Sequence, residues 1–185
     1  MRVLFRVFLS TLGLLFLAVG QAGADGLVMD KSEIRFVSKQ LGVNVEGRFR
    51  TWKANVVFLP KDLSRSKADF DIDLGSIDLA SDESETEIKS RQWFDIAKFP
   101  TAHFSSTAIR ALGGDRYEVA GKLTLKGVTK DVVIPIAVKK DATGKNVAEG
   151  SFPLKRIDYH VGEGMWSDTD MVADDVVVRI RMVLA

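Results

Sequence analysis

Apolar and polar residues alternate with a two-residue period along most of the chain. The alternation is clearest where Phe70, Ile72 and Leu74 are separated by aspartates. Because successive side chains of a strand point to opposite faces, this pattern predicts strands with one buried and one wet face. Similar patterns cover residues 34–37, 43–58, 101–106, 117–125, 132–138, 147–157 and 175–184. About eight to ten short strands at this spacing are typical of an all-β sandwich or barrel.

Glycine and proline interrupt several predicted strands. Gly47, Gly121 and Gly150 lie inside them, where a missing side chain permits the sharp bend that a closed sheet needs. Pro135 and Pro153 cannot donate to a ladder, so each predicts a bulge, an edge or a bend.

The segment from residue 81 to 91 departs from the alternation and predicts one short surface helix near residues 82–92. Ser84 followed by Glu87 fits a capping box, and Lys89 and Arg91 complement the dipole near the end. The stretch that follows, residues 89–106, is rich in aromatic residues. We expect it to form a crossover that plugs or flanks the β structure.

The first 24 residues have the three parts of a secretory signal. Arg2 and Arg6 precede an apolar run over residues 7–19, and Ala22-Gly23-Ala24 is a small-residue cleavage site. The alternative is a buried N-terminal helix. We predict a cleaved signal peptide over residues 1–24, a single domain over residues 25–185, and location in a bacterial periplasm.

Composition narrows the function. The chain has no cysteine, so its stability must come from packing and not from disulfides. Without Arg2 and Arg6, 24 basic side chains face 25 acidic ones. A net charge this close to zero gives no electrostatic attraction to nucleic acid or to an anionic membrane, so we expect no nucleic-acid partner.

Candidate catalytic and metal-binding residues are few. With no cysteine and two isolated histidines, His103 and His160, a metal site is not expected. His103 is interpreted as an ordinary strand residue. His160 shares a predicted strand face with Asp158, and such a pair could orient the imidazole to act as a general base. The sequence offers no nucleophile at a matching spacing.

The C-terminal aspartates match a calcium loop only in part. Asp168 and Asp170 have the right spacing, but the turn glycine and the distal glutamate are missing. We interpret this segment as a solvated loop before the last strand.

The inward apolar residues allow two interpretations. They can fill a core completely, or they can line a barrel wide enough for one apolar ligand, and periodicity does not distinguish the two.

Five motifs occur in order along the chain: residues 30–36 (DKSEIRF), 47–49 (GRF), 89–101 (KSRQWFDIAKFPT), 121–130 (GKLTLKGVTK) and 172–176 (VADDV). On these motifs the chain resembles the YceI-like family, the lipocalin-like polyisoprenoid-binding proteins of bacteria, from about residue 29 to 184. The family often has histidine at two positions that are Gln40 and Glu87 here.

The resemblance implies an antiparallel lipocalin-like barrel of about eight strands, with the helix near its mouth and a hydrophobic channel. It implies a bound isoprenoid quinone or polyprenyl lipid, no catalytic cofactor and no catalysis. The channel residues expected on this basis are Phe36, Val45, Phe49, Trp52, Phe58, Phe70, Ile72, Trp93, Phe94, Phe104, Leu123 and Val178.

We therefore expect a periplasmic carrier that holds an isoprenoid lipid and makes transient contact with a membrane or a membrane quinone enzyme. One alternative is a secreted, stress-related barrel with a filled core that acts through a protein partner. Another is a hydrolase that uses His160 and Asp158.

Overall fold

The computed structural model describes residues 26–184, so the predicted signal peptide lies outside the described residues. Within them the chain forms ten strands, one α-helix and five short 3₁₀ turns, η1–η5. The α-helix is α1 (Asp82–Ile88). The strands are β1 (Glu33–Gln40), β2 (Val43–Phe49), β3 (Trp52–Val57), β4 (Lys67–Asp73), β5 (Ile77–Asp78), β6 (Thr101–Gly113), β7 (Arg116–Leu125), β8 (Val128–Lys140), β9 (Asn146–Lys155) and β10 (Asp175–Leu184).

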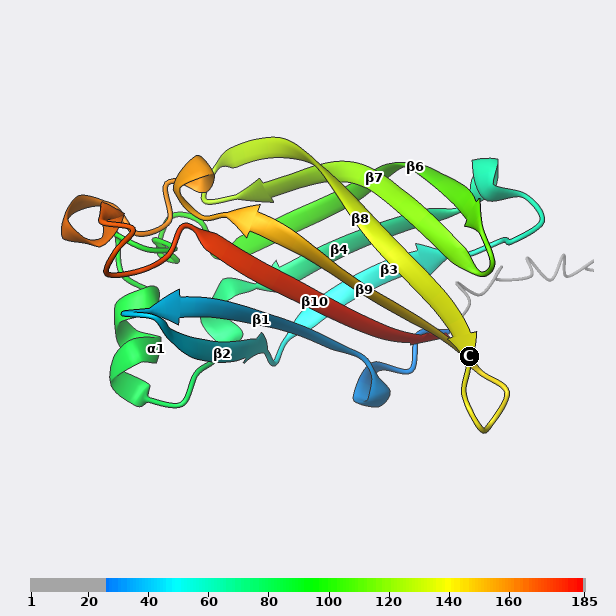
Figure 1. Cartoon of the computed structure of the whole chain (residues 1–185), viewed down its shortest axis with the longest axis horizontal. Helices are drawn as coiled ribbons and strands as arrows, with labels where there is room; N and C mark the ends of the chain where they lie inside the picture. The colour runs from blue at the N-terminus through cyan, green and yellow to red at the C-terminus, as the bar shows by residue number, and fades with distance from the viewer. Residues whose placement is uncertain (1–25, 185) are drawn as a thin grey trace, which may run out of the picture.

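All ten strands belong to one antiparallel sheet in the order β3-β4-β6-β7-β8-β9-β10-β1-β2-β5 (Figure 1). β2 and β3 stand near opposite ends of this order, yet only Arg50 and Thr51 separate them in the chain. The two sides meet there, since the amide of Arg50 donates to the Ser76 carbonyl (3.1 Å) and that of Asp73 to the Thr51 carbonyl (3.1 Å). The sheet therefore curls on itself, which confirms the predicted all-β, antiparallel barrel-like fold.

Two glycines allow the curled sheet to pack tightly. A Cβ on Gly121 would lie 2.5 Å from the ring of Phe104, and one on Gly47 would collide with the ring of Phe36. Each aromatic ring thus lies across a glycine on a neighbouring strand, an arrangement that only a missing side chain permits.

The ladder between β8 and β9 is short. It pairs Ile136–Lys140 with residues 146–150 and then stops, and the two strands diverge from their hairpin (Figure 1). Pro135 lies at this point. Its carbonyl faces Gly150, so its missing N–H is on the β9 side, where the next ladder bond would form. The proline therefore lies where the ladder ends, whereas the sequence predicted a bulge, an edge or a bend at this position.

The helix is shorter than the sequence pattern predicts, and its cap is three residues earlier. The N-cap is Ser81 and not Ser84: the Ser81 Oγ accepts the amide of Ser84, the third residue of the helix, at 3.3 Å. The helix ends at Ile88 because residues 89–99 form successive turns, in which the amide of Phe94 donates to the Ile88 carbonyl (3.0 Å). These turns bury Trp93 and Phe94 in the core.

Several strands have other bounds than predicted. β6 continues through two register shifts to Gly113, and β8 already begins at Val128. β9 ends at Lys155, before η4 (Ile157–Tyr159). No helix in residues 26–184 has the length and hydrophobicity needed to cross a membrane.

Candidate ligand cavity

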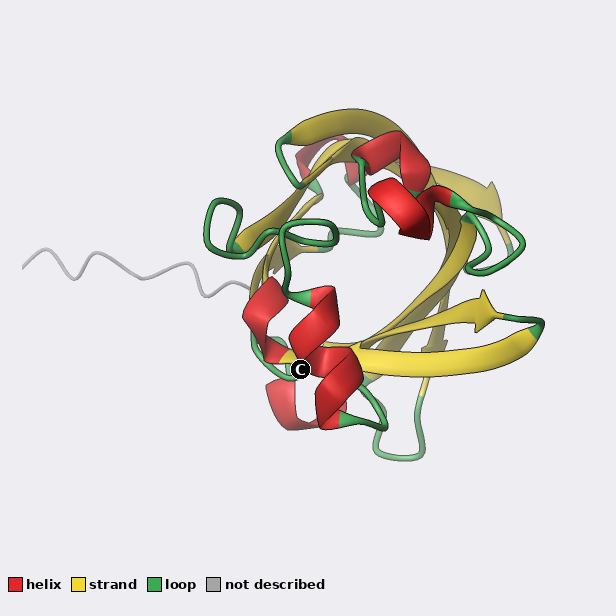
Figure 2. Cartoon of the chain, turned by 90° about the vertical axis from the view of Figure 1, so that its left-hand side faces the viewer, coloured by secondary structure: helices red, strands yellow, loops and turns green. Residues whose placement is uncertain are grey.

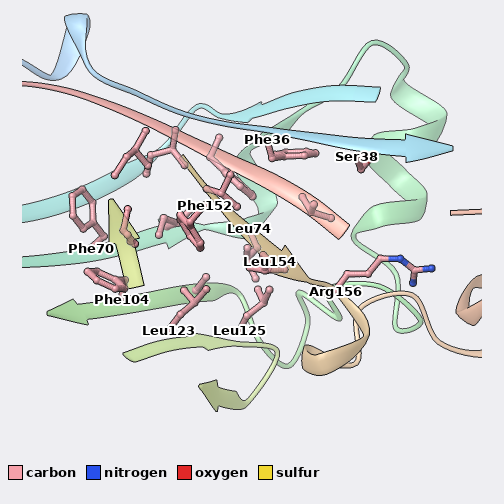
Figure 3. A pocket seen from close by; sticks show the side chains of 18 of the residues that line it. Phe36, Ser38, Phe70, Leu74, Phe104, Leu123, Leu125, Phe152, Leu154 and Arg156 are labelled. Carbon is pink, nitrogen blue, oxygen red and sulfur yellow. The ribbon is translucent and has the colours of Figure 1, made fainter. Parts of the chain in front are cut away.

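The curled sheet encloses a cavity of about 880 Å³. Inward side chains of nearly every strand line it (Figure 3). Phe70 and Phe104 face it from adjacent strands, with ring centroids 6.3 Å apart. Phe58 and Tyr117 meet edge to face at 5.1 Å in its wall. The interior is therefore apolar and aromatic, as suits a hydrocarbon chain.

Eleven of the twelve expected channel residues line this cavity: Phe36, Val45, Phe49, Phe58, Phe70, Ile72, Trp93, Phe94, Phe104, Leu123 and Val178. Trp52 does not. It is buried (7% exposed) and its ring packs 6.1 Å from that of Phe70, so it supports the wall without reaching the lumen.

Other residues that were not expected also line the cavity. Ile134, Ile136, Phe152 and Leu154 face the cavity from β8 and β9, and the two-residue period already places each pair on one face. Trp166 lines it from a 3₁₀ turn, where no periodic signal could reveal it.

One end of the cavity is polar. Figure 2 looks toward this end, where α1 and the turns after β9 lie. Ser38 and Gln40 at the end of β1 line the cavity together with the five polar lining residues of α1: Asp82, Glu83, Ser84, Thr86 and Glu87. Both positions at which the family often has histidine, Gln40 and Glu87, are thus in this mouth.

Arg156 holds the loop that frames the mouth. It lines the cavity, is only 2% exposed, and uses all five of its N–H groups on backbone carbonyls. Nε donates to Ala173 (3.0 Å), one terminal nitrogen to Val161 (2.9 Å) and Gly162 (3.2 Å), and the other to Trp166 (2.7 Å) and Val172 (2.6 Å). Burial lowers the pKa of Arg156 below its ordinary value. The guanidinium therefore acts as a clamp for residues 161–173.

Lys126 is a second buried cation at the same end. Its Nζ donates to the His160 carbonyl (2.6 Å), to Glu163 Oε2 (2.9 Å) and, more weakly, to the Gln92 carbonyl (3.4 Å). The hydrogen bond from Lys126 lowers the pKa of the Glu163 carboxyl. Lys126 thereby ties the turns after the helix to the loop after β9.

Trp93 packs against Arg156 in the same part of the cavity wall. Its ring is 5.5 Å from that of Trp166, and the Arg156 guanidinium carbon is 5.6 Å from its centroid. The Trp93 side chain is buried (8% exposed), and its Nε1 has no acceptor among residues 26–184. Such orphaned donors are rare in proteins and call for a physical explanation.

The candidate catalytic residues do not come together. His160 is not on a strand: it follows η4 in a left-handed conformation (φ 57°) and is 66% exposed, and Asp158 pairs with Lys130 (3.2 Å) instead. The shared strand face expected for His160 and Asp158 is therefore wrong, because β9 ends before both. His103 lies on β6 as expected, with Nδ1 2.7 Å from Asp71 Oδ1 on the exposed side.

The aspartates near the C-terminus lie in turns. Asp168 Oδ1 accepts the amide of Asp170 at 2.9 Å. Residues 26–184 contain no cluster of three or more histidine, cysteine, aspartate or glutamate side chains that could hold a metal ion.

A curled antiparallel sheet around an apolar cavity with a polar mouth defines a lipocalin-like binding barrel. A family model described as the YceI-like domain matches residues 27–184, and the chain belongs to this family.

Relatives match over most of the chain. A UPF0312 protein of Azotobacter vinelandii is 31% identical over 180 residues, covering 92% of this chain and 93% of its own. A UPF0312 protein of Pseudomonas aeruginosa is 34% identical over 160 residues, covering 81% and 83%.

Solved structures share the fold. Burkholderia cenocepacia BcnA is similar with a TM-score of 0.82 and 36% identity, over 86% of this chain and 100% of that one. A polyisoprenoid binding domain from Saccharophagus degradans, implicated in plant cell wall breakdown, has a TM-score of 0.67 at 20% identity, over 86% and 97%. At that identity the second likeness supports the fold alone.

Proposed function

We propose that this protein is a carrier that holds an isoprenoid lipid, a quinone or a polyprenyl chain, with the tail inside the barrel. The observation that supports this most directly is the enclosed apolar cavity of about 880 Å³ with its polar mouth. Enclosing about 400 Å² of apolar tail stabilises the complex by about 10 kcal/mol at 25 cal/mol per Å², before the cost of association. This driving force keeps a water-insoluble chain out of water while the carrier is in an aqueous space.

Two further findings support the ligand class and the compartment. The chain is a YceI-like protein, and a structural neighbour is described as a polyisoprenoid binding domain. The predicted signal peptide agrees with work in the periplasm, between membranes, where a carrier would meet a membrane or a membrane quinone enzyme.

The competing function, a barrel that acts through a protein partner, assumed a filled core. The barrel of residues 26–184 is hollow, so that alternative loses its premise.

The direct test is mass spectrometry of an organic extract of the protein, purified from a bacterial periplasm without detergent. We expect a near-stoichiometric isoprenoid, whose mass also identifies the head group. An empty protein that also fails to take up added quinone would refute the carrier function.

A plugged barrel provides a matched comparison. Ala148 lines the cavity, so Ala148→Phe places a ring in the lumen and should abolish lipid capture while the protein stays folded. Ala120 lies next to the inward Gly121 on β7 and faces outward, so Ala120→Phe should retain the lipid. Equal lipid content in both variants would show that the lipid binds outside the barrel.

A further inference from the structure

The mouth beside α1 carries unbalanced negative charge. Asp82, Glu83 and Glu87 line the cavity, and none of them forms an ion pair within residues 26–184. The fourth acid of the helix, Glu85, does not line the cavity and is near two cations, Arg50 and Lys89, at 3.9 Å each. Three carboxylates therefore line the opening without an ion-pair partner, and only Asp82 interacts at longer range with Arg50.

The basic residues of the cavity wall do not offset them. Arg156 has every N–H engaged by a backbone carbonyl. Lys67 lines the cavity at the start of β4, and Figure 1 shows that this end of β4 and α1 are at opposite ends of the barrel. Among the lining residues no basic side chain remains to receive an anion at the mouth.

The same end of the cavity has a hydrogen-bond donor without an acceptor. The Trp93 indole N–H is buried and unpaired, and Trp93 is part of the cavity wall. An unmade hydrogen bond of a buried donor costs about 1–3 kcal/mol, which an oxygen atom of a ligand would recover.

We propose that the cavity selects amphiphiles whose head group is uncharged and bears an acceptor oxygen, such as a carbonyl or a hydroxyl, and rejects phosphate heads. This inference rests on the proposed function and specifies its ligand class. A phosphate monoester carries a charge of about −1.5 to −2 at neutral pH and would be repelled by the three carboxylates of the mouth. A carbonyl or hydroxyl oxygen meets no such repulsion and can accept the Trp93 N–H.

The test compares two probes with the same tail, farnesol and farnesyl phosphate, by titration calorimetry on lipid-free protein. At low salt, farnesol should bind at least about tenfold more tightly. The variant D82N/E83Q/E87Q should reduce this ratio by about tenfold through tighter phosphate binding alone. D30N/E46Q/D115N neutralises three exposed acids that do not line the cavity, and it should leave the ratio unchanged.

Two further measurements make the test independent of how well the triple variant folds. The single change Glu87→Gln should reduce the ratio about twofold, and about 0.5 M salt should reduce it in the unaltered protein because salt screens exposed charges. If farnesol binds but the ratio is near one, or does not respond to the mouth variants, the charge selection is wrong and the carrier function stands. If neither probe binds, the carrier function fails, and this inference fails with it.

Discussion

Replacing Arg156 tests whether one buried side chain holds the mouth of the barrel. Arg156→Met keeps an unbranched apolar stem and loses the guanidinium with all five hydrogen bonds. A hydrogen bond to a charged group is worth about 1.5–3 kcal/mol, but removing a buried cation also removes its desolvation cost. We therefore expect a net loss of about 3–5 kcal/mol in the free energy of unfolding, a large share of a typical total of about 5–15 kcal/mol.

Urea unfolding followed by circular dichroism measures this loss. Arg156→Lys keeps the charge but offers at most three N–H donors, so its loss should be intermediate. Arg179→Met is the control, because Arg179 is exposed on β10, and it should change stability by less than about 0.5 kcal/mol. If Arg156→Met unfolds within about 1 kcal/mol of the unaltered protein, the clamp is not what stabilises residues 161–173.

Three more predictions test the wall, the seam and the orphaned donor. Gly121→Val should lower the free energy of unfolding by about 1–3 kcal/mol because its side chain overlaps the Phe104 ring, whereas Ala120→Val should be neutral in the same melts. Two arginines hold the pKa of Asp78 below its usual 3.8, so its carboxylate stabilises the fold above that pH and loses the effect as pH falls through the lower folded value. At pH 6 the melting temperature of Asp78→Asn should thus be lower than that of the unaltered protein, and this difference should shrink below about pH 3.8. A difference that stays constant with pH would contradict the role of the Asp78 carboxylate. In calorimetry, Trp93→Phe should weaken the binding of farnesol about fivefold more than the binding of a hydrocarbon of the same length. An equal loss of affinity for both would exclude the indole N–H as the hydrogen-bond partner of the farnesol oxygen.

The strands and most of the cavity wall could be predicted because one physical rule governs both. In a curled sheet with one wet face, alternation identifies the inward side chains, so Phe70, Phe104 and Leu123 were found from the pattern together with the family resemblance. The two-residue period places Trp52 on the same strand face as Phe58, but Trp52 is buried beside the seam and does not line the lumen. Parity identifies a face, and it cannot say how far along a strand the cavity extends.

The ends of elements and the buried cations could not be predicted from the sequence. Lys89 and Arg91 look like the charged end of a helix, yet the chain turns after Ile88 in order to bury aromatic residues. Charged residues such as Arg156 and Lys126 are expected at the surface. They are buried here because a loop distant in the sequence brings together the carbonyls that accept their hydrogen bonds. A hydrogen-bond network closed by loops leaves no periodic trace in the sequence.

The hollow interior explains why the mouth is built from such a network. An apolar cavity leaves its lining side chains without part of the contacts that a filled core would give them. The barrel must therefore be stabilised at its margins, and the seam near Arg50 and the clamps of Arg156 and Lys126 are at margins. Both clamps donate mainly to backbone carbonyls and thereby fix the shape of the opening. The acids of α1 are not used by the clamps, so they can interact with the head group of a ligand. This division between apolar wall, clamped loops and acidic mouth fits both proposals, in which the wall encloses the tail and the mouth distinguishes head groups.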